Sequence, residues 1–214
     1  MTNQFFETRH MLIAPTVMHK LNKKPIDAFR KVIAPHGEKI LMHASNFRKV
    51  KRIDDVITIF ANVRKAMPAK LLMVGDGPER HAAEEQARTL GIEEDIRFLG
   101  KQEQMEDILA VSDVFLLPSE YESFGLAALE AMAARAVVIS TNAGGLSEIN
   151  NQGITGFMAN VGDTESMSNF AIELLRDEAR LVKMKEAAYQ QACLFDISKI
   201  IPVYEKLYSR FCRM

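Results

Sequence analysis

Short apolar runs alternate with longer helical segments along most of the chain, and this alternation is the feature that most limits its fold. Runs of strand length are found at residues 39–45, 70–74, 95–99, 113–117, 136–140 and 154–158. Each run is followed by a polar or glycine-containing loop and then by a segment with helical spacing, such as the amphipathic stretch from Ile53 to Met67. Strands that alternate with helices pair in parallel, through right-handed crossovers that place helices on both faces. The sequence therefore predicts an α/β fold: a single Rossmann-like, doubly wound parallel sheet of about six strands, followed by C-terminal helices.

Length, charge and cysteine content exclude several classes of protein. The 214 residues are enough for one ordinary domain with a single core. A formal net charge of −1 gives no support for binding to nucleic acid or to an anionic membrane. No apolar run reaches the length of a membrane span, no signal peptide is visible, and Cys193 and Cys212 lack the spacing of a metal or redox motif. We therefore expect a cytoplasmic protein with no nucleic-acid partner and no stable membrane insertion.

The expected organisation is a lead-in or linker over residues 1–24 and one domain over residues 25–214. The last helix, residues 196–212, carries a single apolar stripe at helical spacing. Its members are Ile197, Ile200, Ile201, Tyr204, Leu207, Tyr208 and Phe211. This stripe is longer than one small domain needs, so it predicts either a homodimer through this helix or a helix that folds back onto its own sheet.

The strongest local pattern spans residues 114–133. An apolar run ends at Pro118, which has no N–H group to pair within a sheet. A polar loop follows, and Gly125 then precedes the strong helix-forming sequence Leu-Ala-Ala-Leu-Glu-Ala-Met-Ala. A helix that begins directly after a strand points free N–H groups and the positive end of its dipole beyond the sheet, which suits an anion. Two carboxylates flank this turn, Glu122 in the loop and Glu130 within the helix.

A basic loop, residues 46–52, follows the first predicted strand. It carries four cations, Arg48, Lys49, Lys51 and Arg52. Such a cluster is most often a solvated surface. The carboxyl ends of parallel strands meet at one edge of a sheet, however, where α/β folds bind their ligands. We therefore expect the basic loop to lie near the loop that carries Glu122.

The segment from Glu122 to Glu130, Glu-Ser-Phe-Gly-Leu-Ala-Ala-Leu-Glu, resembles the Glu-x7-Glu motif of the retaining GT-B glycosyltransferases of family 4. The likeness covers nearly the whole chain after Lys39. It implies that Glu122 orients the donor sugar and that Glu130 holds the ribose of the nucleotide. It also implies donor contacts from the residues around the helix start, Ser123, Phe124, Gly125 and Leu126.

In the same family, the basic loop neutralises the diphosphate of the donor through an Arg and, five positions later, a Lys. The Lys corresponds to Lys51, but Asn46 stands at the Arg position. The resemblance implies that Lys51 stabilises the leaving diphosphate, with Arg48 supplying the missing charge and Asn46 also contacting the donor. Gly100 and Lys101 lie where the family seats the uracil. No Asp-x-Asp motif is evident, so these cations are expected to replace a metal ion, and no metal or other cofactor is predicted.

The sequence departs from the family pattern again at Arg135. Family members usually end the motif helix with a glycine in the left-handed conformation. Arginine lacks the freedom of glycine at positive φ, so we expect the end of this helix to be built differently.

The resemblance implies that the chain is the C-terminal, donor-binding half of a GT-B enzyme. Its ligand would be UDP or a UDP-sugar, with UDP-N-acetylglucosamine as the expected donor, and transfer to a small acceptor would proceed with retention. Before Lys39 the chain has no room for the N-terminal domain of such an enzyme. That missing domain is an expected partner, to which the helix over residues 196–212 would cross. The isolated chain is therefore expected to transfer sugar weakly or not at all.

Two other classes stay open on the sequence. One is a different nucleotide-dependent enzyme on the same fold. No Walker loop supports it, and Gly75-x-Gly77 lacks the third glycine of a dinucleotide fingerprint because Arg80 holds that position; we interpret these glycines as turn geometry. The other is a non-catalytic nucleotide-binding or assembly module with the same fold.

Overall fold

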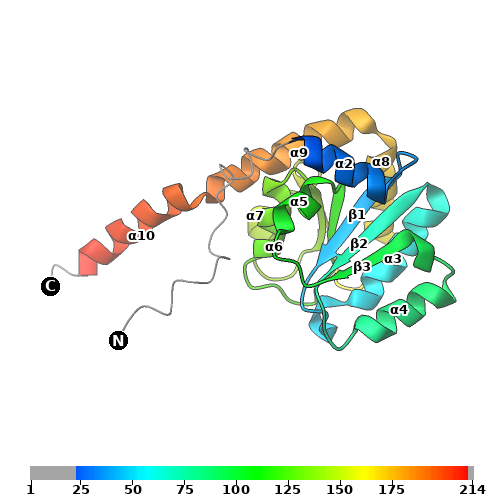
Figure 1. Cartoon of the computed structure of the whole chain (residues 1–214). Helices are drawn as coiled ribbons and strands as arrows, with labels where there is room; N and C mark the ends of the chain where they lie inside the picture. Colours follow the sequence, from blue (N-terminus) through cyan, green and yellow to red (C-terminus); the bar gives the residue numbers. More distant parts are fainter. Residues whose placement is uncertain (1–22, 212–214) are drawn as a thin grey trace.

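The computed structural model describes residues 23–211, so most of the predicted lead-in and Cys212 lie outside the described residues. The described chain forms one parallel sheet in the order β3-β2-β1-β4-β5-β6, with helices on both faces (Figure 1). The strands are β1 (Lys39–Ala44), β2 (Ala69–Val74), β3 (Ile96–Gly100), β4 (Val114–Leu117), β5 (Val137–Thr141) and β6 (Gly156–Ala159). Every predicted strand overlaps an observed one, and the predicted Rossmann-like, doubly wound sheet is confirmed.

The helices bury the sheet on both sides. They are α2 (Lys23–Ile33), α3 (Ile53–Ala66), α4 (Arg80–Thr89), α5 (Met105–Ala110), α6 (Leu126–Ala133), α7 (Leu146–Ile149), α8 (Thr164–Arg176), α9 (Glu178–Ala192) and α10 (Ile197–Phe211), with 3₁₀ turns η1 (Lys49–Lys51), η2 (Glu93–Asp95) and η3 (Cys193–Phe195). One core layer packs α3, α4 and α8 against Leu41 and Leu71, and the other packs α5, α6 and the end of α9 against Met42 and Leu72. Successive strand residues alternate between these layers, which explains why each strand is a continuous apolar run.

The order of the strands reverses between β1 and β4. From β1 the chain winds outward through β2 and β3, and it then returns to β4 and winds the other way through β5 and β6. The pairing of β1 with β2 runs from Lys39 to Ala44, whereas the pairing of β1 with β4 covers Leu41 and Met42. The two central strands therefore separate toward their carboxyl ends. A crevice at such a switch point is where open α/β sheets bind ligands.

Arg135 contradicts the expected end of the motif helix. It adopts the left-handed conformation itself, with φ 64°, and its N–H donates to the carbonyl of Met132. Its guanidinium lies 3.8 Å from the centroid of the Tyr189 ring and pairs with Glu186. Positive φ at a non-glycine residue costs on the order of 1–3 kcal/mol. The cation–π contact, of about 0.5–2 kcal/mol, offsets part of that strain.

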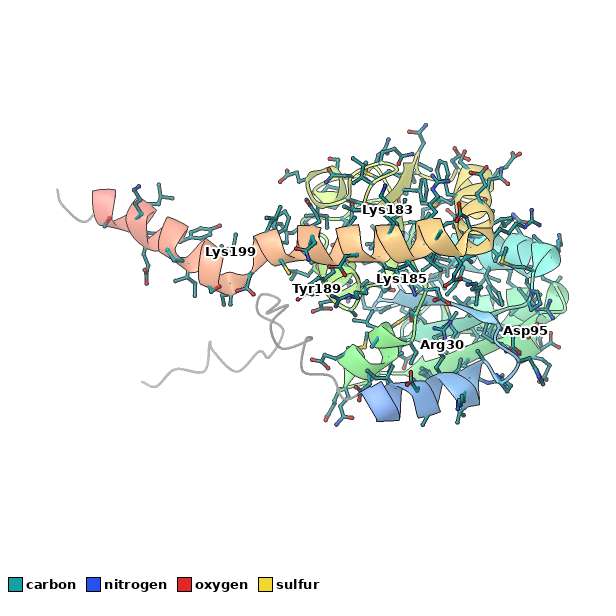
Figure 2. All side chains as sticks on the ribbon, turned by 90° about the horizontal axis from the view of Figure 1, so that it is seen from above. Arg30, Asp95, Lys183, Lys185, Tyr189 and Lys199 are labelled. Atoms are coloured by element: carbon teal, nitrogen blue, oxygen red, sulfur yellow. The ribbon has the colours of Figure 1, made fainter. Side chains whose placement is uncertain are left out.

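The last helix, α10, extends away from the rest of the domain (Figure 1). Figure 2 shows the same projection from above, with α10 continuing beyond the end of α9. Its first turn is fixed by Asp196, whose carboxylate accepts hydrogen bonds from the N–H and the hydroxyl of Ser198. Four large side chains of the predicted stripe are 44–63% exposed: Ile201, Tyr204, Leu207 and Tyr208. The alternative in which this helix folds back onto its own sheet is therefore wrong.

Among the helices that the structure describes, none combines the length and the apolar character needed to cross a membrane.

Candidate functional site

A cavity of about 370 Å³ lies at the carboxyl ends of β1 and β4, where these strands separate. Its walls come from the loop after β1 and from the loop and helix start after β4. The lining residues are Ala44, Ser45, Asn46, Lys51, Leu117, Glu122, Ser123, Phe124, Gly125, Leu126 and Ala127. The volume falls within the roughly 300–1,000 Å³ typical of small-molecule sites. The predicted proximity of the basic loop to the Glu122 loop is confirmed.

The loop after β1 is built so that one cation turns into this cavity. The Phe47 side chain is completely buried and anchors the loop in the core. The chain then makes the turn η1, and Arg52, in the left-handed conformation with φ 49°, leads it into α3 while its guanidinium pairs with Asp55. As a result the Lys51 side chain lies in the cavity wall and is only 20% exposed.

The loop after β4 places the start of α6 on the opposite wall. Gly125 has φ 85°, and a Cβ at this position would lie 2.8 Å from the Cδ1 atom of Ile149. The left-handed conformation favours glycine, and any larger residue would also have to displace the ends of the Ile149 and Leu146 side chains. The helix begins at the next residue, and the N–H groups of its first turn have no intrahelical partners. This end of α6 carries the positive end of the helix dipole at the cavity.

Lys51 and Glu122 form an ion pair within the cavity. The Lys51 Nζ atom lies 2.6 Å from the Glu122 Oε2 atom, and the Glu122 side chain is 18% exposed. The sequence predicted a role for each residue toward a ligand but did not predict that they bind one another. A cation, a carboxylate and a helix N-terminus in one cavity suit a ligand that carries both negative charge and hydroxyl groups.

Two glycine-containing turns hold the site loops from outside. A Cβ on Gly75, after β2, would lie 1.8 Å from the carbonyl oxygen of Ser45. A Cβ on Gly144, after β5, would lie 1.9 Å from the carbonyl oxygen of Glu122. Both site loops are thus packed backbone against backbone, at a separation that no side chain allows. Turn geometry was the only role predicted for Gly75 and Gly77. The structure adds a second role, because both glycines pack against the backbone of the loop after β1.

The structure brings together most of the predicted site residues. Those in the cavity lining are Asn46, Lys51, Glu122, Ser123, Phe124, Gly125 and Leu126. Those outside the lining are Arg48, Gly100, Lys101 and Glu130. Arg48 is exposed before η1, and Gly100 ends β3, two strands away from β1. Ser45 also lines the cavity and was missed, although its position at the carboxyl end of the first predicted strand was a signal.

Among the side chains that the structure describes, no group of three His, Cys, Asp or Glu residues is arranged to hold a metal ion. That neither a metal nor another cofactor takes part stays a prediction.

Comparison with known proteins gives matches of two kinds. Residues 26–191 match the sequence model of the glycosyl transferases group 1. The N-acetyl-alpha-D-glucosaminyl L-malate synthase of Bacillus anthracis is 46% identical over 176 residues, which are 80% of this chain and 45% of that protein. A D-inositol 3-phosphate glycosyltransferase of Corynebacterium urealyticum is 34% identical over 152 residues, which are 66% of this chain and 36% of that protein. The chain thus spans less than half the length of these relatives.

A solved structure shares the fold. The Anabaena protein Alr3699/HepE, crystallised in complex with UDP and glucose, matches with a TM-score of 0.83 at 23% identity. The match covers 92% of this chain and 55% of the Anabaena chain.

Proposed function

Because the chain belongs to the glycosyl transferases group 1 family, we propose that it is the donor-binding part of a retaining glycosyltransferase that uses a UDP-sugar. The observation that carries the proposal is the cavity at the ends of β1 and β4, which joins Lys51, Glu122 and the start of α6. The name of the 46%-identical relative supports N-acetylglucosamine as the sugar and a small molecule as the acceptor. The UDP and glucose bound by the Anabaena protein support UDP as the nucleotide.

In this proposal the two charges of the ion pair act on different parts of the donor. Lys51 and the N–H groups at the start of α6 hold the diphosphate and stabilise the negative charge that grows on it as the sugar leaves. Glu122 accepts hydrogen bonds from the hydroxyl groups of the sugar, and Glu130 does so from the ribose. The donor separates Lys51 from Glu122 and gives each of them a new partner. These groups supply the charge stabilisation without a metal ion or another cofactor.

We further propose that the chain works together with a second domain. It spans 45% of the length of the Bacillus anthracis relative, so more than half of a comparable enzyme lies elsewhere. That domain would carry the acceptor site and would receive α10. The described domain alone then binds the donor but transfers sugar weakly or not at all.

The Lys51→Ala variant tests the assignment of the donor site. We expect its affinity for UDP, measured by isothermal titration calorimetry, to fall by about 1–3 kcal/mol, or roughly 5- to 150-fold, because a charge-assisted contact is lost. Glu122 would also be left as an unpaired negative charge beside the diphosphate. Lys49→Ala is the matched control, because Lys49 is an exposed lysine of the same turn that does not line the cavity. Equal UDP affinity of the wild-type and Lys51→Ala proteins would show that this loop does not bind the diphosphate.

We also propose that the chain without a second domain forms a homodimer through the exposed face of α10. Each large apolar side chain left in water forgoes roughly 1.5–3 kcal/mol of burial, and a second copy is the simplest source of a complementary surface. Sedimentation velocity over a concentration series should show a dimer that Leu207→Glu dissociates and that Lys206→Glu, a change at the neighbouring exposed position, leaves intact. A strict monomer at high micromolar concentration, unaffected by Leu207→Glu, would rule the dimer out.

A further inference from the structure

His43 joins the two central strands at the point where they separate. The residue lies in β1 and is fully buried. Its Nδ1 atom lies 2.8 Å from the carbonyl oxygen of Leu116 on β4, and its Nε2 atom lies 2.8 Å from the hydroxyl oxygen of Ser45. The backbone pairing of β1 with β4 ends one residue earlier, at Met42 and Phe115. The imidazole therefore joins β1 to β4 at the position where the next backbone hydrogen bond would lie. It also contacts Ser45, at the start of the loop that lines the cavity.

These contacts determine where the protons are. A carbonyl oxygen can only accept a hydrogen bond, so Nδ1 must carry the proton and donate it to Leu116. Burial lowers the pKa of His43 to about 4, the charge of Lys51 acts in the same direction, and the bond to Leu116 opposes them. The ring is then neutral at pH 7, and Nε2 carries a lone pair. Nε2 accepts, and the hydroxyl of Ser45 donates its single proton to it.

Ser45 lines the cavity, and with its proton held by His43 it can present only lone pairs to a ligand. We propose that Ser45 is a further donor-binding residue, whose hydroxyl accepts a hydrogen bond from a hydroxyl or amide N–H group of the transferred sugar. His43 is a positioning residue that acts through Ser45. The identity of the ligand rests on the proposed function, whereas the polarity of the hydroxyl rests on the contacts and the burial of His43.

The cavity holds two hydrogen-bond acceptors, and the sugar is the part of a nucleotide sugar that can donate to both. The carboxylate of Glu122 and the hydroxyl of Ser45 both line it, and both need a ligand that donates hydrogen bonds. A diphosphate at pH 7 offers acceptors only, so it would be repelled by both groups. The nucleoside is expected at Glu130 and Gly100, which lie outside the lining. The hydroxyl and acetamido groups of the sugar are the remaining donors.

The geometry does not suit a nucleophilic serine. A base that removes a serine proton works best with a pKa near the operating pH, whereas burial holds the pKa of His43 at about 4. Its Nδ1 atom also faces a neutral carbonyl, not a carboxylate that would stabilise an imidazolium. The pair is therefore built for binding and orientation.

The first experiment tests the polarity without any ligand. We expect nitrogen-15 NMR of the histidine-labelled full chain at pH 7 to show His43 neutral, with its proton on Nδ1. The His43→Asn variant assigns the resonance by its loss, and Ser45→Ala should shift the Nε2 signal because that atom loses its donor. A proton found on Nε2, or a doubly protonated ring, would overturn the inference.

The second experiment measures affinities by calorimetry. Ser45→Ala should weaken binding of UDP-N-acetylglucosamine about 3- to 10-fold, the effect of one neutral hydrogen bond, and leave binding of UDP within about twofold. Ser209→Ala is the control, since Ser209 is an exposed serine on α10. Unchanged affinity of Ser45→Ala for the sugar nucleotide would refute the role of Ser45. A wild-type protein that binds neither ligand would instead refute the proposed function.

A double-mutant cycle tests whether His43 acts through Ser45. Asparagine at position 43 can still donate to the Leu116 carbonyl but cannot reach the Ser45 hydroxyl, so His43→Asn frees the serine proton. The variant should lose part of the preference for UDP-N-acetylglucosamine over UDP. Adding His43→Asn to Ser45→Ala should then cause little further loss. If the loss of affinity in the double variant equals the product of the losses in the two single variants, His43 has only a structural role.

Discussion

Replacing Gly144 with alanine is expected to weaken binding of UDP-N-acetylglucosamine at least about tenfold and to destabilise the fold by about 2–4 kcal/mol. The residue has φ 61°, and its new Cβ would lie 1.9 Å from the carbonyl oxygen of Glu122, where ordinary contact begins at 3.4 Å. The obstacle is backbone, so the whole Glu122 loop must move. Its displacement would take the carboxylate away from Lys51 and from the proposed position of the sugar. Calorimetry and urea denaturation measure the two effects.

Gly153→Ala separates this clash from the cost of positive φ. Gly153 has φ 73°, but a Cβ there would meet no atom within 4 Å. We expect this control to lose only the stability that the left-handed backbone costs alanine, about 1–2 kcal/mol, and to keep its donor affinity. If Gly144→Ala bound the donor as well as Gly153→Ala does, the contact between the two loops would not control the site.

The second large effect is expected at Asp113, at the edge of the sheet opposite the cavity. Its buried carboxylate accepts hydrogen bonds from Arg30 at 2.8 Å, from the N–H of Ile40 at 2.9 Å and from Lys185 at 2.6 Å. Figure 2 labels Arg30 on α2 and Lys185 on α9. Asp113 thus links these two helices to the amino ends of β1 and β4. Asp113→Ala should lower the free energy of unfolding by about 2–4 kcal/mol, because three donors lose one acceptor.

The pH dependence of this loss has a definite sign. Burial alone would raise the pKa of Asp113, but Lys185 and Arg30 outweigh it and hold the pKa below its usual value of 3.8. The stabilisation is therefore complete above about pH 3.8 and is lost as the pH falls through the lower value of the folded state. Urea denaturation should show that the difference in free energy of unfolding between the wild-type and Asp113→Ala proteins becomes smaller in acid.

Two comparisons make the Asp113 result specific. Glu178→Ala breaks the ion pair between Glu178 and Lys39. Because the Glu178 side chain is 69% exposed, this change should lower the free energy of unfolding by less than about 1 kcal/mol. The affinity of folded Asp113→Ala for UDP should match the wild-type value, because the cavity lies at the far ends of the strands. A loss for Asp113→Ala no larger than that for Glu178→Ala would contradict the argument.

The fold was accessible from the sequence because its main determinant is local. Strands buried on both faces must be apolar throughout, so runs such as 70–74 and 136–140 are visible without knowledge of their neighbours. The end of α6 was not accessible in the same way. Arg135 adopts positive φ with the help of Tyr189 and Glu186, which lie more than fifty residues later in the sequence. The direction of α10 was likewise not visible in the sequence, because it depends on which surface its apolar face can pack against.

The candidate site could be predicted as far as its motif extends. The segment from Glu122 to Leu126 is continuous, and the position of the basic loop follows from the parallel sheet. The ion pair of Lys51 with Glu122 joins residues 71 positions apart, and the bond of His43 to Leu116 joins residues 73 apart. Neither has a local pattern, since each depends on how far β1 and β4 separate. The backbone contact of Gly144 with Glu122 was hidden as well, because it depends on how the loops after β4 and β5 pack together.

The ion pair between Lys51 and Glu122 has a consequence for which anions the site accepts. A sulfate ion could replace Glu122 as the partner of Lys51. Sulfate carries no hydroxyl group at neutral pH, however, so Glu122, which is only 18% exposed, would be left charged and without a partner. In the proposed function, a UDP-sugar avoids this cost because its diphosphate pairs with Lys51 while its sugar hydroxyl groups donate to Glu122. Glu122 would then compete against a simple anion such as sulfate for Lys51, and it would not compete against a sugar nucleotide.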